Sequence, residues 1–147
     1  MLAVKTTGIS HVYLPSKDVG ESIAFYTEQL GFKLLRHYRM ADRDSAYVEL
    51  GGVLVELTSS DTTPAADGRF ELRLGVGVPD LATAIADLKA AGVPVLREPW
   101  EARTFWGLQA QIQDPSGWVI SLREWQAPDG PKFPGWMPRH DDVERIA

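Results

Sequence analysis

The sequence predicts an α+β fold made of two copies of one βαβββ module. The first observation is that residues 8–32 hold a short apolar strand followed by an amphipathic helix that ends at a glycine. The second is that a shift of 62 residues places Asp18 on Asp80 and Ile23 on Ile85. The third is that strand-like runs follow each of the two helices. A duplicated module accounts for all three observations.

The first module is expected over residues 8–58 and opens with a strand over 9–14. β-branched and aromatic residues cluster there, and Pro15 should end the strand because proline cannot donate to a ladder. Alternation places His11 and Tyr13 on one face of this strand.

The helix of the first module should run from Ser16 or Asp18, either of which can cap it, to Leu30. Gly31 supplies the left-handed residue that stops it. Apolar residues recur at helical spacing and form one stripe, which should cover the face of the first strand opposite His11: Val19, Ile23, Tyr26 and Leu30.

Three further strands complete the first module, over residues 33–38, 46–50 and 53–58. Gly51-Gly52 is a strong signal for a two-residue hairpin between the last two. In the final strand Glu56 places a carboxylate in the middle of an apolar run.

The second module is expected over residues 70–125, after a turn-rich linker over 59–69. The tail over 126–147 is dense in proline and glycine, and we expect it to wrap over the domain or reach a second subunit. The two modules together form a single domain over 1–147. The second module's elements are a strand over 70–78, a helix over 80–91 and strands over 93–96, 107–113 and 118–122.

Composition limits the class of function. The chain has 147 residues, 44% of them hydrophobic, which suits one compact domain. Fifteen Lys and Arg against twenty Asp and Glu give a net charge of −5 without long runs, which argues against a nucleic acid or an anionic membrane as partner. The absence of cysteine excludes disulfides and thiolate sites. With no signal-peptide pattern and no long apolar run, we expect a cytoplasmic protein that binds a small molecule.

With the repeat laid out, the sequence resembles the vicinal oxygen chelate superfamily, which includes glyoxalase I, extradiol ring-cleaving dioxygenases and the metal-free bleomycin resistance proteins. The resemblance rests on His11 placed seven residues before Asp18, on the helix end FYTEQLGF and on the segment DPSGWVISL. It covers Gly8 to about Trp125. It implies that the two modules form an eight-stranded open barrel and that the protein is a homodimer.

Metal-binding members of that superfamily hold a divalent ion with a residue from the first and the last strand of each module. By resemblance these positions are His11 and Glu56 in the first module, and Arg73 and Ser121 in the second. Arginine keeps its proton and serine is a weak neutral ligand, so the second half departs from the pattern. Glu71 is the nearby candidate for a third donor. A catalytic metal needs about three donors, so we expect no cofactor, with an iron, zinc, manganese or nickel ion as the alternative.

The same residues suggest chemistry that needs no metal. His11 would act as general acid or base, Glu56 would orient it or carry the proton, and Arg73 would hold an anionic oxygen, with Ser121 beside it. Tyr13 shares the face of His11. In the superfamily the two modules enclose a cup that holds the site, and the resemblance places one aromatic pair at its mouth: Phe105 and Trp106.

Three functions remain open at this point. The preferred one is a lyase, isomerase or cyclase that transfers a proton on an anionic or carbonyl substrate. The second is a binding protein that sequesters an aromatic or antibiotic-like ligand, and the third is a metal-dependent lyase or dioxygenase. A structural ion pair between Glu56 and Arg73 is the main alternative to any catalytic role. Buried pairs of this kind are often neutral for stability, so such a pair would itself require an explanation.

Overall fold

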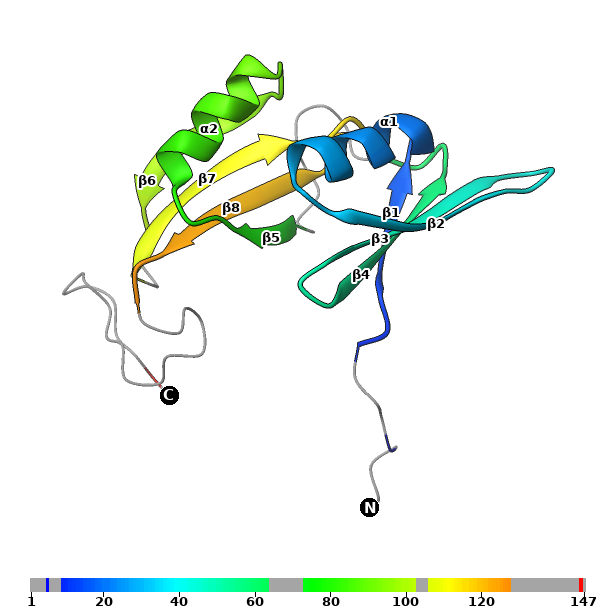
Figure 1. Ribbon diagram of the computed structural model, residues 1–147, viewed down its shortest axis with the longest axis horizontal. Helices are drawn as coiled ribbons and strands as arrows, with labels where there is room; N and C mark the ends of the chain where they lie inside the picture. Colours follow the sequence, from blue (N-terminus) through cyan, green and yellow to red (C-terminus); the bar gives the residue numbers. More distant parts are fainter. Residues whose placement is uncertain (1–4, 6–8, 64–72, 103–105, 128–145, 147) are drawn as a thin grey trace. The chain divides into compact units, whose positions relative to one another are not determined.

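The computed structural model describes residues 5, 9–63, 73–102, 106–127 and 146, and the chain divides into two compact units, residues 1–65 and 66–147 (Figure 1). Each unit contains one strand, one helical segment and three further strands, in that order. The predicted α+β fold of two βαβββ modules is confirmed. Within the described residues, no helix is long and apolar enough to cross a membrane.

The first unit is built on a four-stranded sheet with the order β1-β4-β3-β2. β1 (Val12–Ser16) runs parallel to β4 (Val53–Ser59), and β3 (Asp44–Leu50) pairs antiparallel with both β4 and β2 (Lys33–Arg39). The β3–β4 hairpin turns at Gly51-Gly52, whose φ angles of 58° and 82° are those of the predicted turn. This turn fixes the register that the site depends on.

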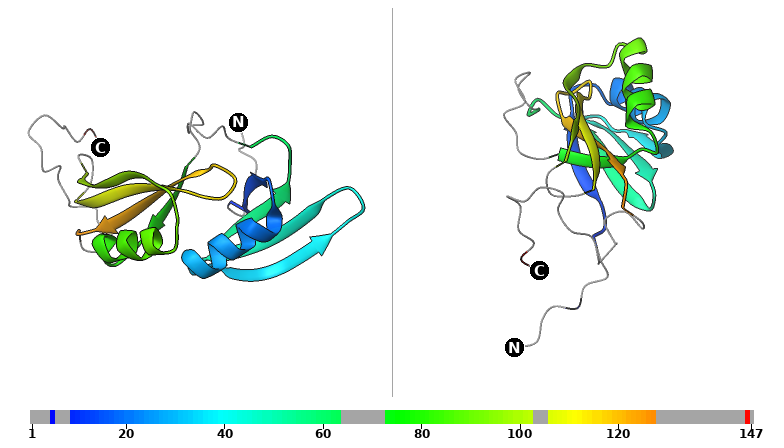
Figure 2. Two further views of the ribbon diagram at one scale, coloured as in Figure 1. Left: turned by 90° about the horizontal axis from the view of Figure 1, so that it is seen from above. Right: turned by 90° about the vertical axis from the view of Figure 1, so that its left-hand side faces the viewer.

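The helical segment of the first unit covers one face of its sheet, and Figure 2 shows α1 lying against that face. α1 (Val19–Ala24) begins after Asp18, whose side chain accepts a hydrogen bond from the backbone N–H of Glu21 at 2.9 Å. The segment continues as a π-helix, η1 (Phe25–Gln29), which the sequence did not predict. The core between this segment and the sheet is formed by buried side chains of both: Val19 and Tyr26 from the segment, and Leu14, Val48, Val55 and Leu57 from the sheet.

The prediction that Pro15 ends the first strand was wrong. β1 continues through Pro15 to Ser16, and Pro15 pairs with Thr58 of β4. β1 is an edge strand, so the missing N–H of proline can point away from the ladder without breaking it. Because Ser16 belongs to β1, Asp18 alone caps the helix.

The second unit repeats this plan with the strand order β5-β8-β7-β6. β5 (Arg73–Gly77) is parallel to β8 (Val119–Trp125), and β7 (Gly107–Gln113) lies between β8 and β6 (Val95–Glu101). Its helix α2 (Leu81–Ala90) is capped by Asp80, which accepts from the backbone N–H of Thr83 at 2.9 Å, as Asp18 does in the first unit. Most of the predicted tail over 126–147 lies outside the described residues.

Candidate functional site

His11 and Glu56 meet on the face of the first sheet that points away from α1. Nε2 of His11 lies 3.1 Å from Oε2 of Glu56, and their side chains are 37% and 20% exposed. The other ring nitrogen, Nδ1, lies 2.9 Å from the hydroxyl of Ser10. Both ring nitrogens are therefore engaged, whereas the carboxylate of Glu56 keeps lone pairs for further donors.

Tyr47 is the third member of this site, and the sequence analysis missed it. It lies directly opposite Glu56 on β3, and its ring is edge-on to that of His11, with centroids 6.4 Å apart and planes at 78°. The negative charge of Glu56, followed by burial and a hydrogen bond to the same carboxylate, raises the pKa of Tyr47. A signal was available, because the hairpin at Gly51-Gly52 pairs Leu50 with Val53 and, three steps outward, Tyr47 with Glu56.

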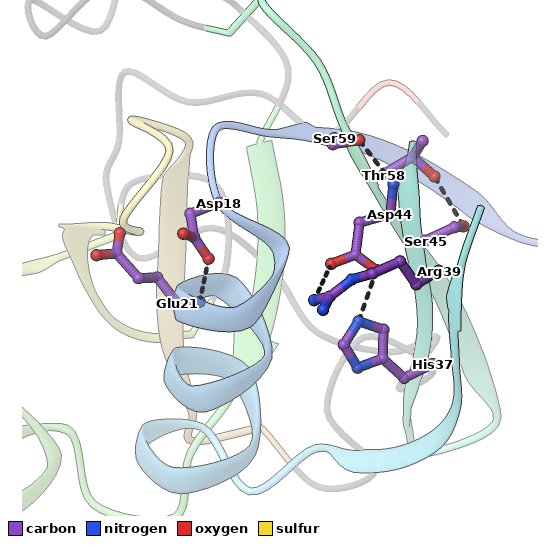
Figure 3. Close-up of polar contacts among 8 residues, drawn as sticks. All are labelled: Asp18, Glu21, His37, Arg39, Asp44, Ser45, Thr58 and Ser59. Atoms are coloured by element: carbon purple, nitrogen blue, oxygen red, sulfur yellow. Dashed lines mark hydrogen bonds and ion pairs between the residues drawn. The ribbon is translucent and has the colours of Figure 1, made fainter. Parts of the chain in front are cut away.

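A chain of hydroxyl groups holds the other oxygen of the carboxylate. The Thr58 hydroxyl donates to Oε1 of Glu56 at 3.3 Å, and the Ser45 hydroxyl lies 3.0 Å from that of Thr58, a contact drawn in Figure 3. Since a hydroxyl has one proton to donate, Ser45 is the donor to Thr58. Both residues are buried. The carboxylate is thus oriented from both of its oxygens.

The same face of the sheet is hollowed beside this group. One hollow of ≈ 540 Å³ lies along β2 and is lined by Tyr38, Tyr47 and Leu54 among others. A second, of ≈ 330 Å³, is lined by Tyr38, Tyr47 and Glu56 among others. Tyr13, predicted to share the face of His11, pairs in register with Glu56 on β1 and is exposed. A small molecule bound in this region would contact the carboxylate.

In the second unit Ser121 occupies the position that Glu56 has in the first. Glu56 lies between Tyr13 and Tyr47 in the ladder, and Ser121 lies in the same register between Gly75 and Gln111. Ser121 is buried.

Of the other predicted site residues in the second module, the structure describes two. Arg73 is the exposed first residue of β5. Trp106 is half-buried just before β7, while Glu71 and Phe105 lie outside the described residues. That these residues and Ser121 join His11 and Glu56 in one site stays a prediction.

The donors in the described part of the chain do not fit a catalytic metal. Its His, Asp and Glu side chains include no group of three that could hold an ion. His11 and Glu56 supply two donors, and the equivalent positions of the second unit supply a guanidinium and a hydroxyl. A mononuclear catalytic site needs about three nitrogen or carboxylate donors, so we derive no step through a metal.

A second polar cluster lies on the opposite face of the first sheet (Figure 3). Oδ1 of Asp44 lies 2.7 Å from Nε2 of His37, and Oδ2 lies 3.1 Å from Nη2 of Arg39. Burial works to raise the pKa of Asp44, but hydrogen bonds from Arg39 and His37, together with their charges, outweigh it and lower the pKa. His37 pairs with the buried Ala46, so this cluster is separate from Glu56 and fastens the β2–β3 hairpin.

Comparison with known proteins agrees with this fold. Residues 8–122 match the family model of the Glyoxalase/Bleomycin resistance protein/Dioxygenase superfamily. A probable lactoylglutathione lyase of Vibrio cholerae is 31% identical over 121 residues, which is 78% of this chain and 88% of that protein. A lactoylglutathione lyase of Arabidopsis thaliana is 28% identical over 142 residues, and this chain matches 50% of its length.

Two solved structures extend the comparison. Glyoxalase I of Leishmania major superposes with a TM-score of 0.65 at 26% identity, over 81% of this chain and 87% of that one. TnmS3, described as an antibiotic binding protein from Streptomyces, superposes with a TM-score of 0.60 at 31% identity, over 81% of this chain and 98% of that one.

The curated relatives support an enzyme of the lyase type that acts on a small molecule. Together with the duplicated βαβββ fold and the family match over residues 8–122, they settle the family. The chain belongs to the glyoxalase/bleomycin resistance protein/dioxygenase superfamily.

Proposed function

We propose that the protein is a lyase- or isomerase-type enzyme that moves a proton on a small anionic or carbonyl substrate, with Glu56 and His11 as its acid–base pair. The observation that carries this proposal is the 3.1 Å contact between His11 Nε2 and Glu56 Oε2, beside a hollow of ≈ 330 Å³ that Glu56 lines. A general acid or base must lie within hydrogen-bond reach of the substrate proton, and the hollow leaves room for a substrate there.

Glu56 is the member of the pair that takes the proton. Both ring nitrogens of His11 already have partners, whereas the carboxylate has lone pairs to spare. In the proposed step Glu56 removes a proton from a carbon next to a carbonyl group, and the bonding electrons move onto the carbonyl oxygen. In an isomerase the deprotonated carbon carries a hydroxyl: the hydroxyl proton passes to the enolate oxygen, a new carbonyl forms there, and Glu56 returns its proton to the former carbonyl carbon. In a lyase the carbonyl forms again as the bond to a leaving group on the next carbon breaks. Arg73 remains the predicted anchor for the anionic oxygen.

The test is solvent deuterium exchange measured by proton NMR, using the adduct of methylglyoxal and glutathione and a panel of small 2-hydroxy and 2-oxo acids. We expect Glu56→Gln to slow exchange by about 100-fold or more, the usual loss when a general base is removed. Glu21→Gln is the matched control, because Glu21 lies on α1 with an exposed side chain. Equal exchange rates in wild-type protein and Glu56→Gln would contradict the proposal.

A binding protein is the second candidate. It is favoured by the antibiotic-binding neighbour TnmS3 and by exposed aromatic rings beside Glu56, namely Tyr13 and Tyr38, which are 47% and 49% exposed. A binder requires shape and stacking but no proton transfer. It would keep its ligand affinity in Glu56→Gln and catalyse no exchange on any member of the panel.

We also propose that the enzyme acts in the cytoplasm as a homodimer, as the sequence analysis expects. Sedimentation velocity at two protein concentrations tests the dimer.

A further inference from the structure

The hollowed face of the first sheet forms a groove along β2 and β3, here called the β2–β3 groove. Its two hollows, of ≈ 540 Å³ and ≈ 330 Å³, share the side chains of Tyr38 and Tyr47 in their walls. Sites for small molecules commonly measure about 300–1,000 Å³. The groove therefore has room for a ligand larger than the reacting group that Glu56 would contact.

Positive charge gathers in the β2–β3 groove although the chain carries a net charge of −5. Within the described residues no carboxylate pairs with Arg36 or Arg43, whereas Arg39 is tied to Asp44. An unpaired guanidinium on the wall of a groove favours an anionic ligand. The groove is lined by the carboxylate of Glu56 and by three basic side chains that have no carboxylate partner in the described part of the chain: Lys33, Arg36 and Arg43. Arg39 borders it too, but its guanidinium pairs with Asp44 on the opposite face of the sheet.

Exposed apolar side chains line the same groove. Tyr38 is 49% exposed and Leu34 is 41% exposed, and Leu35 and Met40 beside them are exposed as well. Aromatic and aliphatic walls next to guanidinium groups suit a flat conjugated ring, which can stack on tyrosine and lie under arginine. A small polar anion would leave this apolar surface uncovered.

We propose that the β2–β3 groove binds a planar conjugated anion, such as an aromatic carboxylate, with its ring against Tyr38 and Tyr47 and its negative group at Arg36 or Arg43. The carbon that loses its proton lies on a carbonyl-bearing side chain of that ring, next to Glu56, because the aromatic carboxylate itself has no such proton. This inference rests on the proposed function in one respect: it makes the groove the substrate-binding surface for the proton transfer at Glu56. It names the substrate class, which the acid–base pair alone does not.

The test compares three probes by isothermal titration calorimetry and by ¹H–¹⁵N NMR. The probes are 2-naphthoate, its neutral counterpart 2-naphthalenemethanol, and the non-aromatic anion cyclohexanecarboxylate. We expect 2-naphthoate to bind about tenfold more tightly than either of the others, because it alone engages both guanidinium and aromatic groups. Its NMR shifts should fall on β2, β3 and β4.

Variants separate the contributions of the guanidinium groups and of the aromatic ring to the binding affinity. Arg36→Gln with Arg43→Gln should weaken 2-naphthoate by about tenfold and 2-naphthalenemethanol by only about twofold, the loss of the contact between ring and guanidinium, while Tyr38→Ala should weaken both. Lys89→Gln is the control for each single arginine replacement, since it removes one positive charge outside the groove: Lys89 lies on α2 and pairs with Glu98. It should leave every affinity within about twofold.

Each outcome bears on the inference separately from the catalytic proposal. Equal affinity for the three probes, shifts outside β2–β4, or an arginine double variant that binds like wild-type protein would overturn the inference. Glu56→Gln should keep its preference for 2-naphthoate, because the groove and the carboxylate have different tasks. A Glu56→Gln variant that binds 2-naphthoate selectively and still exchanges substrate protons would overturn only the catalytic proposal.

Discussion

Replacing Glu56 by leucine should remove turnover and leave the stability of the protein nearly unchanged. The variant loses the partly exposed pair with His11, worth about 0–1 kcal/mol, and the hydrogen bonds from Thr58 and Tyr47, worth about 0.5–1 kcal/mol each. It gains a largely buried leucine, worth about 1.5 kcal/mol or somewhat more, since the side chain at this position is 20% exposed. The losses of about 1–3 kcal/mol and the gain differ by no more than about 1.5 kcal/mol, while turnover falls by about 100-fold or more.

The next residue of β4, Leu57, provides the control for a purely structural loss. Leu57 points to the other face of β4 and is fully buried beneath α1. Its replacement by alanine should lower the unfolding free energy by about 2–5 kcal/mol. Urea unfolding followed by far-UV circular dichroism measures both variants. Tryptophan fluorescence would not serve, because all five tryptophans lie in the second unit.

Two results would refute this reasoning. A loss of more than about 2 kcal/mol in Glu56→Leu would show that the carboxylate is a structural requirement of the sheet rather than a functional group. Turnover that survives the substitution would show that Glu56 does not carry the proton.

The helix caps, Asp44 and Tyr47 provide three further tests. Asp18→Ala and Asp80→Ala each remove a helix cap and should each lower the unfolding free energy by about 1 kcal/mol. The two losses should add, because the caps lie in different units. Urea titrations of the single and double variants measure both effects. The pKa of Asp44 lies below its ordinary value of 3.8, so the ionised carboxylate stabilises the fold above that pH. This stabilisation is lost as the pH falls through the lower pKa of the folded protein. The unfolding free energies of wild-type protein and Asp44→Asn, measured between pH 5 and 2, should therefore converge at the acid end. The pKa of Tyr47 is raised chiefly by the charge of Glu56, so Glu56→Gln should bring it back toward 10.0 in an ultraviolet titration.

The repeat and the hairpin turn made the fold predictable from the sequence. Helical spacing in residues 19–30 and alternation in residues 53–58 each identify the buried side of an element, and Gly51-Gly52 sets the register between two strands. The π-helix over Phe25–Gln29 carries no comparable signal, because its apolar residues fit ordinary helical spacing equally well. The extension of β1 through Pro15 depends on its place at the edge of the sheet, which only the strand order reveals.

The candidate site was only partly predictable. His11 and Glu56 were predicted from the resemblance to the superfamily, and their 3.1 Å contact shows that the parallel β1–β4 pairing brings them together. The hairpin register places Tyr47 opposite Glu56, but the sequence analysis missed this residue because tyrosine in a strand is usually a packing residue. The pair of His37 with Asp44 could not be read from the sequence, since the β2–β3 register contains a shift between Leu34 and Arg36 that no local pattern specifies.

The two units show why such a fold can change its chemistry without changing its architecture. In β4 the residues on either side of Glu56 are buried in the core, and in β8 the residues on either side of Ser121 are buried in the same way. In β4, alternation therefore separates the two tasks along one strand: one set of side chains stabilises the sheet, and the other, which includes Glu56, faces the hollow. A carboxylate at one such position and a hydroxyl at its counterpart leave both cores intact. The reaction must accordingly be inferred from the side chains that face the hollow, because the residues that determine the fold lie on the other side.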